Sequence, residues 1–112
     1  MTKGDWLGEF EQVVLLAVAR LDRSGYGLTI RREIERRTGR RVSVGAVYAT
    51  LTRLEDKGYV ESWQGEATSR RGGRSKRHYG VLPGGARALE TTRRMLERMW
   101  DGMEEPMKPR RA

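Results

Sequence analysis

Cysteine is absent from this 112-residue chain, and histidine occurs once, at His78. Without cysteine there is no disulfide, no thiolate nucleophile and no cysteine-ligated zinc site. His78 stands between Arg77 and Tyr79, with no acid nearby in the sequence to orient it, which is a poor setting for acid–base chemistry or metal binding. We therefore expect no enzyme activity, no metal and no cofactor.

Long apolar runs are also absent. The longest, at residues 13–19, is much too short to span a bilayer, and the N-terminal stretch MTKGDWLGEFEQ has no apolar core of the signal-peptide kind. We expect a soluble cytoplasmic protein without a membrane partner. A chain of this length forms one domain with a small core, which a dimer would help to stabilise.

Acidic residues are few relative to basic ones. The chain has 15 Asp and Glu against 23 Lys and Arg, a net charge of +8 and a pI near 10.6. This balance favours a polyanionic partner, with nucleic acid ahead of an anionic membrane surface.

The stretch SVGAVYATLTRLEDKG, residues 43–58, predicts a helix that meets the partner. Ser43 is a good N-cap, and apolar residues at positions 44, 47, 51 and 54 form one stripe. Gly58 can take the left-handed conformation that ends a helix. The opposite face is slim enough for a DNA major groove and carries Gly45, Ala46, Tyr48, Ala49, Thr52 and Arg53. An ordinary core helix is the alternative.

Two further helices precede this one. Residues 9–21 are apolar around most of the helix, which predicts burial, in part between subunits. Residues 26–38 form an amphipathic helix whose charged outer face includes the four-apart pair Glu33 and Arg37. Three helices in this order, with a short link before the third, predict a helix-turn-helix.

After Gly58 the apolar period changes from 3.6 to 2, so residues 59–66 and 76–82 predict a β-hairpin. Its tip is small, polar and basic, and we expect it to act as a wing that reaches a phosphate backbone or a minor groove. The candidate contacts are Arg70, Arg71, Arg74 and Lys76. A solvated loop that only aids solubility is the alternative.

The last helix, residues 83–104, repeats apolar residues with a seven-residue beat typical of a two-stranded coiled coil. Such a stripe finds no room in a small core, so we expect a two-fold dimer. The expected dimer residues are Phe10, Val13, Val14, Leu89, Leu96, Met99, Trp100 and Met103.

These patterns predict an α+β fold, mainly α with a small hairpin: a winged helix-turn-helix with a C-terminal dimerisation helix. The expected parts are an N-terminal arm at residues 1–8, a winged helix-turn-helix DNA-binding domain at 9–82, the dimerisation helix at 83–104 and a disordered basic tail at 105–112.

Several short motifs resemble one protein family. They are Tyr26-Gly27, then Ser43-x-Gly45-x-Val47-Tyr48-x-x-Leu51-x-Arg53-Leu54-Glu55, then Lys57-Gly58, Gly73-Arg74 and His78-Tyr79. Over residues 7–90 the chain resembles the PadR-type winged helix-turn-helix transcriptional regulators, in the small subfamily with one C-terminal helix. The resemblance implies that the first and last helices build the dimer, and that some members bind flat aromatic drugs between the subunits.

The resemblance also implies that Ser43, Gly45 and Tyr48 lie against DNA, with the Tyr48 hydroxyl on a phosphate. Tyr48 has the alternative of packing against the second helix. Arg53 is a further candidate, although it could pair with Glu55 or Asp56 instead. The side chains at positions 45, 46 and 49 are too small for bidentate base pairing, so we expect DNA shape and site spacing to carry much of the selection.

Trp100 could stack on a planar hydrophobic effector together with Leu96, Met99 and Met103, because tryptophan and methionine line adaptable apolar pockets. Its alternative is to fill the dimer seam only.

The sequence thus predicts a sequence-specific regulator of transcription that binds double-stranded DNA. We expect a repressor that acts as a homodimer on a pseudo-palindromic operator and is released by a small-molecule effector. A winged-helix RNA-binding or protein-docking module is the alternative. The lack of an aromatic residue at the wing tip argues against RNA, and docking alone would not require a net charge of +8.

Overall fold

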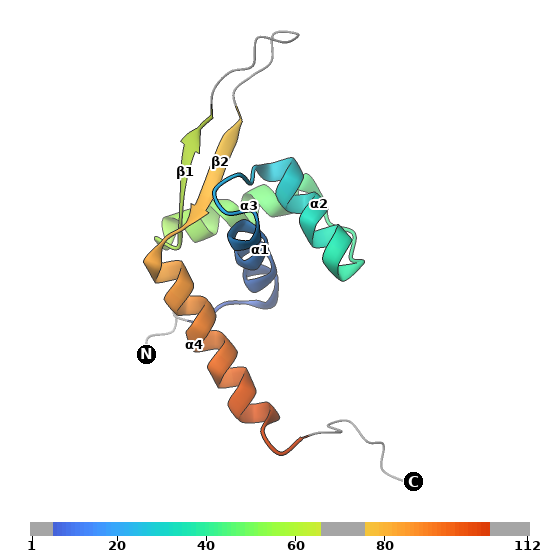
Figure 1. Ribbon diagram of the computed structural model, residues 1–112, viewed down its shortest axis with the longest axis vertical. Helices are drawn as coiled ribbons and strands as arrows, with labels where there is room; N and C mark the ends of the chain where they lie inside the picture. Colours follow the sequence, from blue (N-terminus) through green and yellow to red (C-terminus); the bar gives the residue numbers. More distant parts are fainter. Residues whose placement is uncertain (1–5, 66–75, 104–112) are drawn as a thin grey trace.

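The computed structural model describes residues 6–65 and 76–103. The elements follow one another along the chain in the predicted order (Figure 1): α1 (Glu9–Arg20), α2 (Gly27–Thr38), α3 (Val44–Asp56), β1 (Val60–Gln64), β2 (Arg77–Val81) and α4 (Pro83–Trp100). The α+β winged helix-turn-helix is therefore confirmed. Predictions made for the arm at residues 1–5, the wing tip at 66–75 and the tail at 104–112 lie outside the described residues.

Local sequence signals set the ends of the helices. The Ser43 hydroxyl accepts a hydrogen bond from the Ala46 N–H at 3.0 Å, so it caps α3 as predicted. Gly39, with a φ of 71°, ends α2, and Gly58, with a φ of 77°, follows the last turn of α3. Pro83 opens α4, where its missing N–H costs nothing.

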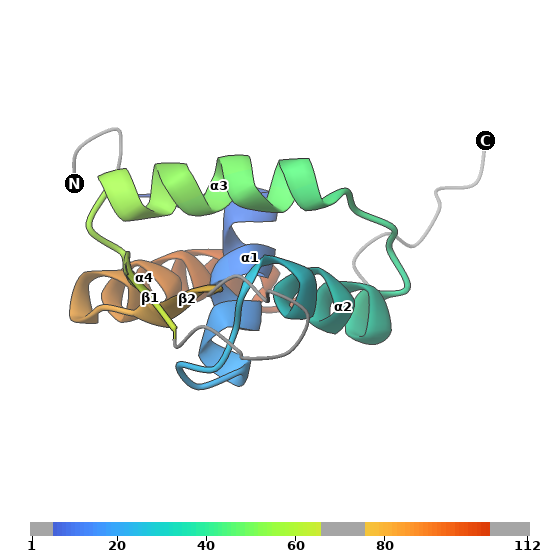
Figure 2. The same cartoon turned by 90° about the horizontal axis from the view of Figure 1, so that it is seen from above.

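The core is apolar and is built around α1, which packs against α2, α3, α4 and β2. α1 contributes three fully buried side chains, Val14, Leu15 and Val18. The facing helices and the hairpin supply most of the rest of the core: Ile30, Ile34, Val47, Leu51, Leu54 and Val60. α3 crosses α1 and presents its stripe inward. Its opposite face is therefore left uncovered along one edge of the molecule (Figure 2).

The hairpin is antiparallel, with Val60 opposite Val81 and Gln64 opposite Arg77. Its base is held by the loop between α1 and α2, because the Tyr79 N–H donates to the Gly25 carbonyl at 3.0 Å. Tyr79 itself is buried. Burial, with the nearby Glu55 carboxylate, raises the pKa of the Tyr79 hydroxyl.

α4 begins against the hairpin and then extends away from the domain (Figure 1). Its inner side carries small residues, and Gly85, Ala88 and Thr92 are buried there. Its far end is exposed, including Met99 at 73% and Trp100 at 56%. In the described part of the chain, no helix combines the length and apolarity needed to cross a membrane.

Candidate nucleic-acid interface

The outer face of α3 is exposed and slim. Gly45, Ala46, Ala49 and Thr52 are all exposed. The Thr52 hydroxyl donates to the Tyr48 carbonyl at 3.0 Å, so its polar atom folds back onto the helix. No bulky side chain separates the backbone of this face from a partner, as a helix that enters a major groove requires.

Tyr48 lies at the border between α3 and α2. Its ring packs over Gly27, the first residue of α2, where a Cβ would collide with the ring and its hydroxyl group. The side chain is nevertheless 40% exposed. The two roles expected for Tyr48 are therefore compatible, because the ring packs on the second helix while part of the side chain stays open to solvent.

Arg53 lies on the other flank of α3 and turns toward α1. Its Nη2 donates to the Thr50 hydroxyl at 3.1 Å, and its Nε lies 4.0 Å from the Glu11 carboxylate. Glu55 instead accepts a hydrogen bond from Ser62 at 2.7 Å. The expected alternative of a pair with Glu55 or Asp56 is thus replaced by a contact with α1.

The cations of α2 are partly paired. Glu33 binds Arg37 at 2.9 Å, as its four-residue spacing predicted, and also binds Arg36 at 2.7 Å. The two guanidinium groups lower the pKa of the Glu33 carboxyl. This part of the positive charge solvates a helix face and has its own counter-ion.

A ladder of rings and cations lies at the base of the wing. Trp63 stacks on His78 with ring centres 6.2 Å apart, and Tyr26 meets the edge of His78 at 5.8 Å. Arg23 lies 4.2 Å above Trp63, and the Lys76 ammonium lies 4.8 Å from the Tyr26 ring. Lys76 is therefore placed where the wing leaves the domain. Arg70, Arg71 and Arg74 lie outside the described residues.

This ladder was not predicted from the sequence. The backbone bridge between Gly25 and Tyr79 brings the loop of residues 21–26 beside the hairpin. The only signal in the sequence was the presence of aromatic residues at Tyr26 and Trp63 and of a cation at Lys76. The ladder ties both strands of the hairpin to the loop between α1 and α2.

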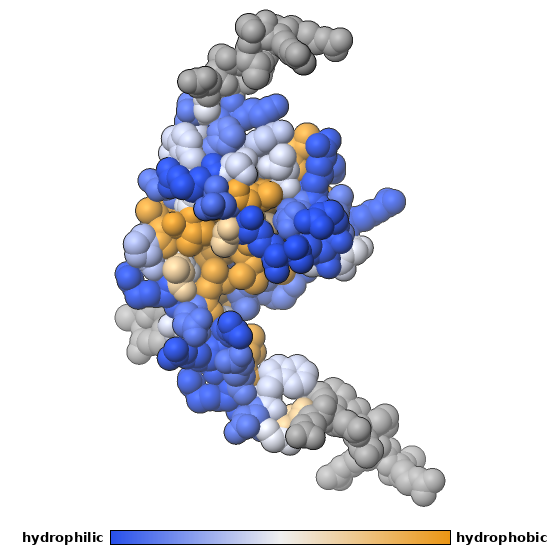
Figure 3. All heavy atoms as spheres, in the orientation of Figure 1, coloured by the Kyte–Doolittle hydropathy of each residue, from blue (hydrophilic) through white to orange (hydrophobic). Residues whose placement is uncertain are grey.

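Among the described residues, most of the exposed large apolar side chains lie on α1 and at the C-terminal end of α4 or just beyond it. Figure 3 shows hydrophobic atoms gathered over α1. Between the two helices runs an open groove of about 450 Å³, whose apolar lining is formed by Leu16, Ala86, Leu89, Leu96 and Trp100. Phe10, Val13 and Leu89 are half-buried, whereas Leu96, Met99, Trp100 and Met103 are exposed.

The burial of two residues of α1 bears on the predicted dimer set, which itself stays a prediction. Val14 has an exposed fraction of 0% within the single chain, so its side chain has no surface left for a partner. Leu16, which the prediction omitted, is 49% exposed. It lies three residues after Val13, a spacing that could have pointed to it. On α4, Thr92 lies between Leu89 and Leu96 of the predicted set but is buried against the domain.

A helix-turn-helix with an uncovered third helix, followed by a two-stranded wing and a further helix, is a winged helix architecture. The chain belongs to the transcriptional regulator PadR-like family, whose model matches residues 15–91. The matched stretch begins within α1, includes all of α2, α3 and the hairpin, and ends within α4. No curated protein is similar enough to this chain to match.

Solved structures share this fold over nearly the whole chain. A PadR family transcription regulator from Clostridium difficile covers 90% of this chain and 100% of its own, with a TM-score of 0.72 and 20% identity. A PadR-like transcriptional regulator from Bacillus cereus covers 90% and 93%, with a TM-score of 0.70 and 18% identity. The complex structure of hsRosR-S4 covers 88% and 76%, with a TM-score of 0.61 and 28% identity.

Proposed function

We propose that this protein is a sequence-specific repressor of transcription that binds a pseudo-palindromic operator in double-stranded DNA as a homodimer. The observation that carries the proposal is the uncovered outer face of α3, exposed at Gly45, Ala46, Ala49 and Thr52. The net charge of +8 supplies the attraction to a polyanion. The proposed place of action is the cytoplasm.

Two kinds of DNA contact are proposed for the helix-turn-helix. Ser43 and the Tyr48 hydroxyl would bind phosphates, which fix the position of the protein without reading sequence. The small residues of α3 would let its backbone approach the base edges. Because such side chains make few bidentate contacts, the sequence-dependent shape of the duplex would carry much of the specificity.

The wing would contribute a second set of phosphate or minor-groove contacts. Lys76 lies at its base beside Tyr26. On the basis of the sequence, we propose that Arg70, Arg71 and Arg74 are the outer DNA contacts of the wing. Arg53 would contact a phosphate from the flank of α3.

The homodimer is supported by apolar surface that a single chain leaves exposed. Leu16 on α1, then Leu96, Met99 and Trp100 on α4, and Met103 just beyond its end are each at least 41% exposed. The half-buried Phe10, Val13 and Leu89 would extend the same surface. A two-fold contact would cover these residues in both copies at once and set the two α3 helices roughly 34 Å apart, one turn of the duplex.

A planar, hydrophobic small molecule is the proposed effector. The groove between α1 and α4 has a volume of about 450 Å³ and ends at Trp100. This volume is in the range of small-molecule sites, roughly 300–1,000 Å³. Leu96, Met99 and Met103 would complete the site. Its occupation would change the angle between the paired α4 helices, and with it the spacing of the α3 helices.

The test is a selection followed by a binding measurement. The purified protein selects a duplex from a randomised DNA pool, and fluorescence anisotropy then compares that duplex with a scrambled one at low and moderate salt. We expect an affinity ratio on the order of 10³ or more that survives moderate salt. Failure to enrich any sequence, with equal and salt-sensitive binding to both duplexes, would refute the proposal and favour the RNA or docking alternative.

A further inference from the structure

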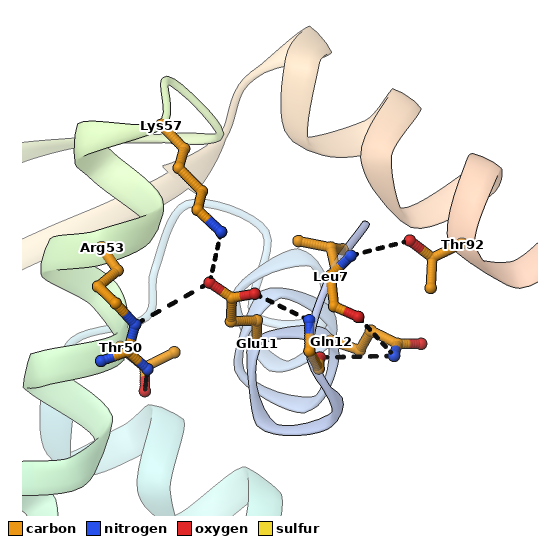
Figure 4. A network of polar contacts seen from close by, with 8 residues as sticks. Leu7, Glu11, Gln12, Thr50, Arg53, Lys57 and Thr92 are labelled. Carbon is orange, nitrogen blue, oxygen red and sulfur yellow. Dashed lines mark hydrogen bonds and ion pairs between the residues drawn. The ribbon is translucent and has the colours of Figure 1, made fainter. Parts of the chain in front are cut away.

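The first turn of α1 joins several parts of the fold (Figure 4). The Glu11 carboxylate accepts hydrogen bonds from the Gly8 backbone N–H and from the Lys57 ammonium, both at 2.8 Å. The Arg53 Nε lies 4.0 Å from the same carboxylate. The Glu11 side chain is only 12% exposed, so water and salt screen these interactions less than those of a surface pair.

Glu9 makes a matching contact at the other end of α3. Both of its carboxylate oxygens accept hydrogen bonds from the Arg40 Nη1, at 2.7 and 2.8 Å. Arg40 lies in the turn before α3, whereas Lys57 is the C-cap residue that ends α3. Acidic side chains from one turn of α1 thus contact α3 or its preceding turn near both ends of the helix. The Glu9 side chain is 68% exposed, so its pair with Arg40 is weaker than the Glu11 contact.

The segment just before this turn is tied to α4. The Leu7 N–H donates to the buried Thr92 hydroxyl at 3.2 Å. Gln12 Nε2 lies 3.3 Å from the Leu7 carbonyl and 3.4 Å from the Gly8 carbonyl, and Gln12 also lines the α1–α4 groove.

We propose that Glu11 and Glu9 are positioning residues for DNA recognition, which fix the angle and depth at which α3 presents its outer face. The inference rests on the proposed DNA binding. The apolar contacts of Val47, Leu51 and Leu54 hold α3 against the core but are non-directional. Ion pairs with short hydrogen bonds are directional, so those near the two ends further restrict the position of the helix.

Releasing α3 from its position and removing the negative charge of Glu11 have opposite effects on DNA affinity, so the proposal can be tested. Removing the Glu11 charge makes the protein more positive and, by electrostatics alone, would tighten its binding to every duplex. Releasing α3 weakens only those contacts that need the correct helix position. The ratio of the affinities for selected and scrambled DNA isolates the second effect.

The experiment measures this ratio by anisotropy for the wild type, Glu11→Gln, Lys57→Gln and the double variant. Asp22→Asn is the charge control, because Asp22 lies in an exposed turn at a φ of 45°, which asparagine also adopts. We expect Glu11→Gln to lower the ratio about three- to tenfold without weakening binding to the scramble. The double variant should be no worse than Glu11→Gln alone, because both changes break one contact.

A ratio that stays at the wild-type value in Glu11→Gln would overturn the proposal, as would additive losses in the double variant. If circular dichroism shows that Glu11→Gln does not fold, Lys57→Gln alone tests the proposal, since it breaks the same contact from the more exposed partner. It should lower the affinity ratio by a similar factor. A wild type that does not discriminate between the duplexes would refute the proposed function itself, and the inference with it.

Discussion

Leu7 and Thr92 lie 85 positions apart in the sequence and are joined by a buried hydrogen bond, in which the Leu7 N–H donates to the Thr92 hydroxyl at 3.2 Å. Leu7 is 6% exposed and Thr92 is 1% exposed. The bond fastens the segment before α1 to the inner side of α4. It is one of the few polar contacts between α4 and the rest of the domain in the described residues.

Thr92→Val tests this bond, because valine keeps the shape of threonine and removes its acceptor. A buried N–H left unpaired costs about 1–3 kcal/mol. We expect the free energy of unfolding in urea to fall by that amount. Thr91→Val, at the half-buried neighbouring position, is the control and should have a smaller effect. Equal losses in the two variants would mean that the bond contributes nothing specific.

Tyr48→Phe removes the proposed phosphate contact and keeps the ring over Gly27. We expect binding to selected and scrambled duplexes to weaken by a similar factor, roughly 10- to 150-fold, since a hydrogen bond to a charged group contributes about 1.5–3 kcal/mol. Anisotropy titrations measure both affinities. If only the affinity for selected DNA falls, the hydroxyl reads a base and not a phosphate.

Gly27→Ala places a methyl group where the Tyr48 ring lies. The ring is the far end of a rotatable side chain, so it can swing away. We expect little loss of stability but a fall in DNA affinity similar to that of Tyr48→Phe, and no further loss when both changes are combined. Gly85→Ala is the contrast, because its Cβ would meet the Tyr59 backbone carbonyl, which cannot rotate. That variant should lose about 1–3 kcal/mol of stability.

Replacement of Arg70, Arg71 and Arg74 by alanine tests the role of the wing. If each arginine neutralises one phosphate, the slope of log affinity against log salt should become shallower by about 0.9 for each arginine that is replaced. The slope is measured by anisotropy between about 50 and 200 mM salt, conditions typical for such titrations. An unchanged slope would show that the wing tip is a solvated loop.

The stability of the fold should depend on pH through Glu11. Burial raises the pKa of the Glu11 carboxyl, but the Lys57 ammonium, the Gly8 N–H and Arg53 together lower it below its ordinary value of 4.5. A carboxyl whose pKa is depressed in the folded state stabilises the fold above the pKa of the unfolded chain, and this contribution is lost as the pH falls through the folded-state pKa.

We therefore expect the stability difference between the wild type and Glu11→Gln to be constant above about pH 5 and to shrink below pH 4.5. Urea unfolding at a series of pH values measures it. A difference that stays constant down to about pH 3 would show that the Glu11 charge does not stabilise the fold.

The helices and the hairpin could be predicted because their signals are local. The Ser43 cap, the apolar stripe of α3 and Gly58 lie within one short stretch, and each was found in its predicted role. The change to a period of two in the apolar pattern was enough for the hairpin. The family resemblance rested on the same local motifs, and it was confirmed.

The candidate site could be predicted only in part. The exposed residues of α3 follow from its periodicity, because the face opposite a buried stripe is open. The partner of Arg53 could not be found in this way, since Glu11 lies 42 positions earlier and comes close only when α1 crosses α3. The same holds for the ring of Tyr48 over Gly27 and for the ladder at the base of the wing.

By itself, the sequence determined the order of the elements, the helix ends, the positive charge and the exposed face of α3, because these depend on neighbouring residues and on composition. Only the tertiary structure decided which apolar residues of α1 are core and which are surface. α1 is apolar nearly all round, so the choice between Val14 inside and Leu16 outside depends on where the other helices approach it. The same packing brings Glu9 and Glu11 to opposite ends of α3, a relationship between distant residues that no local pattern contains.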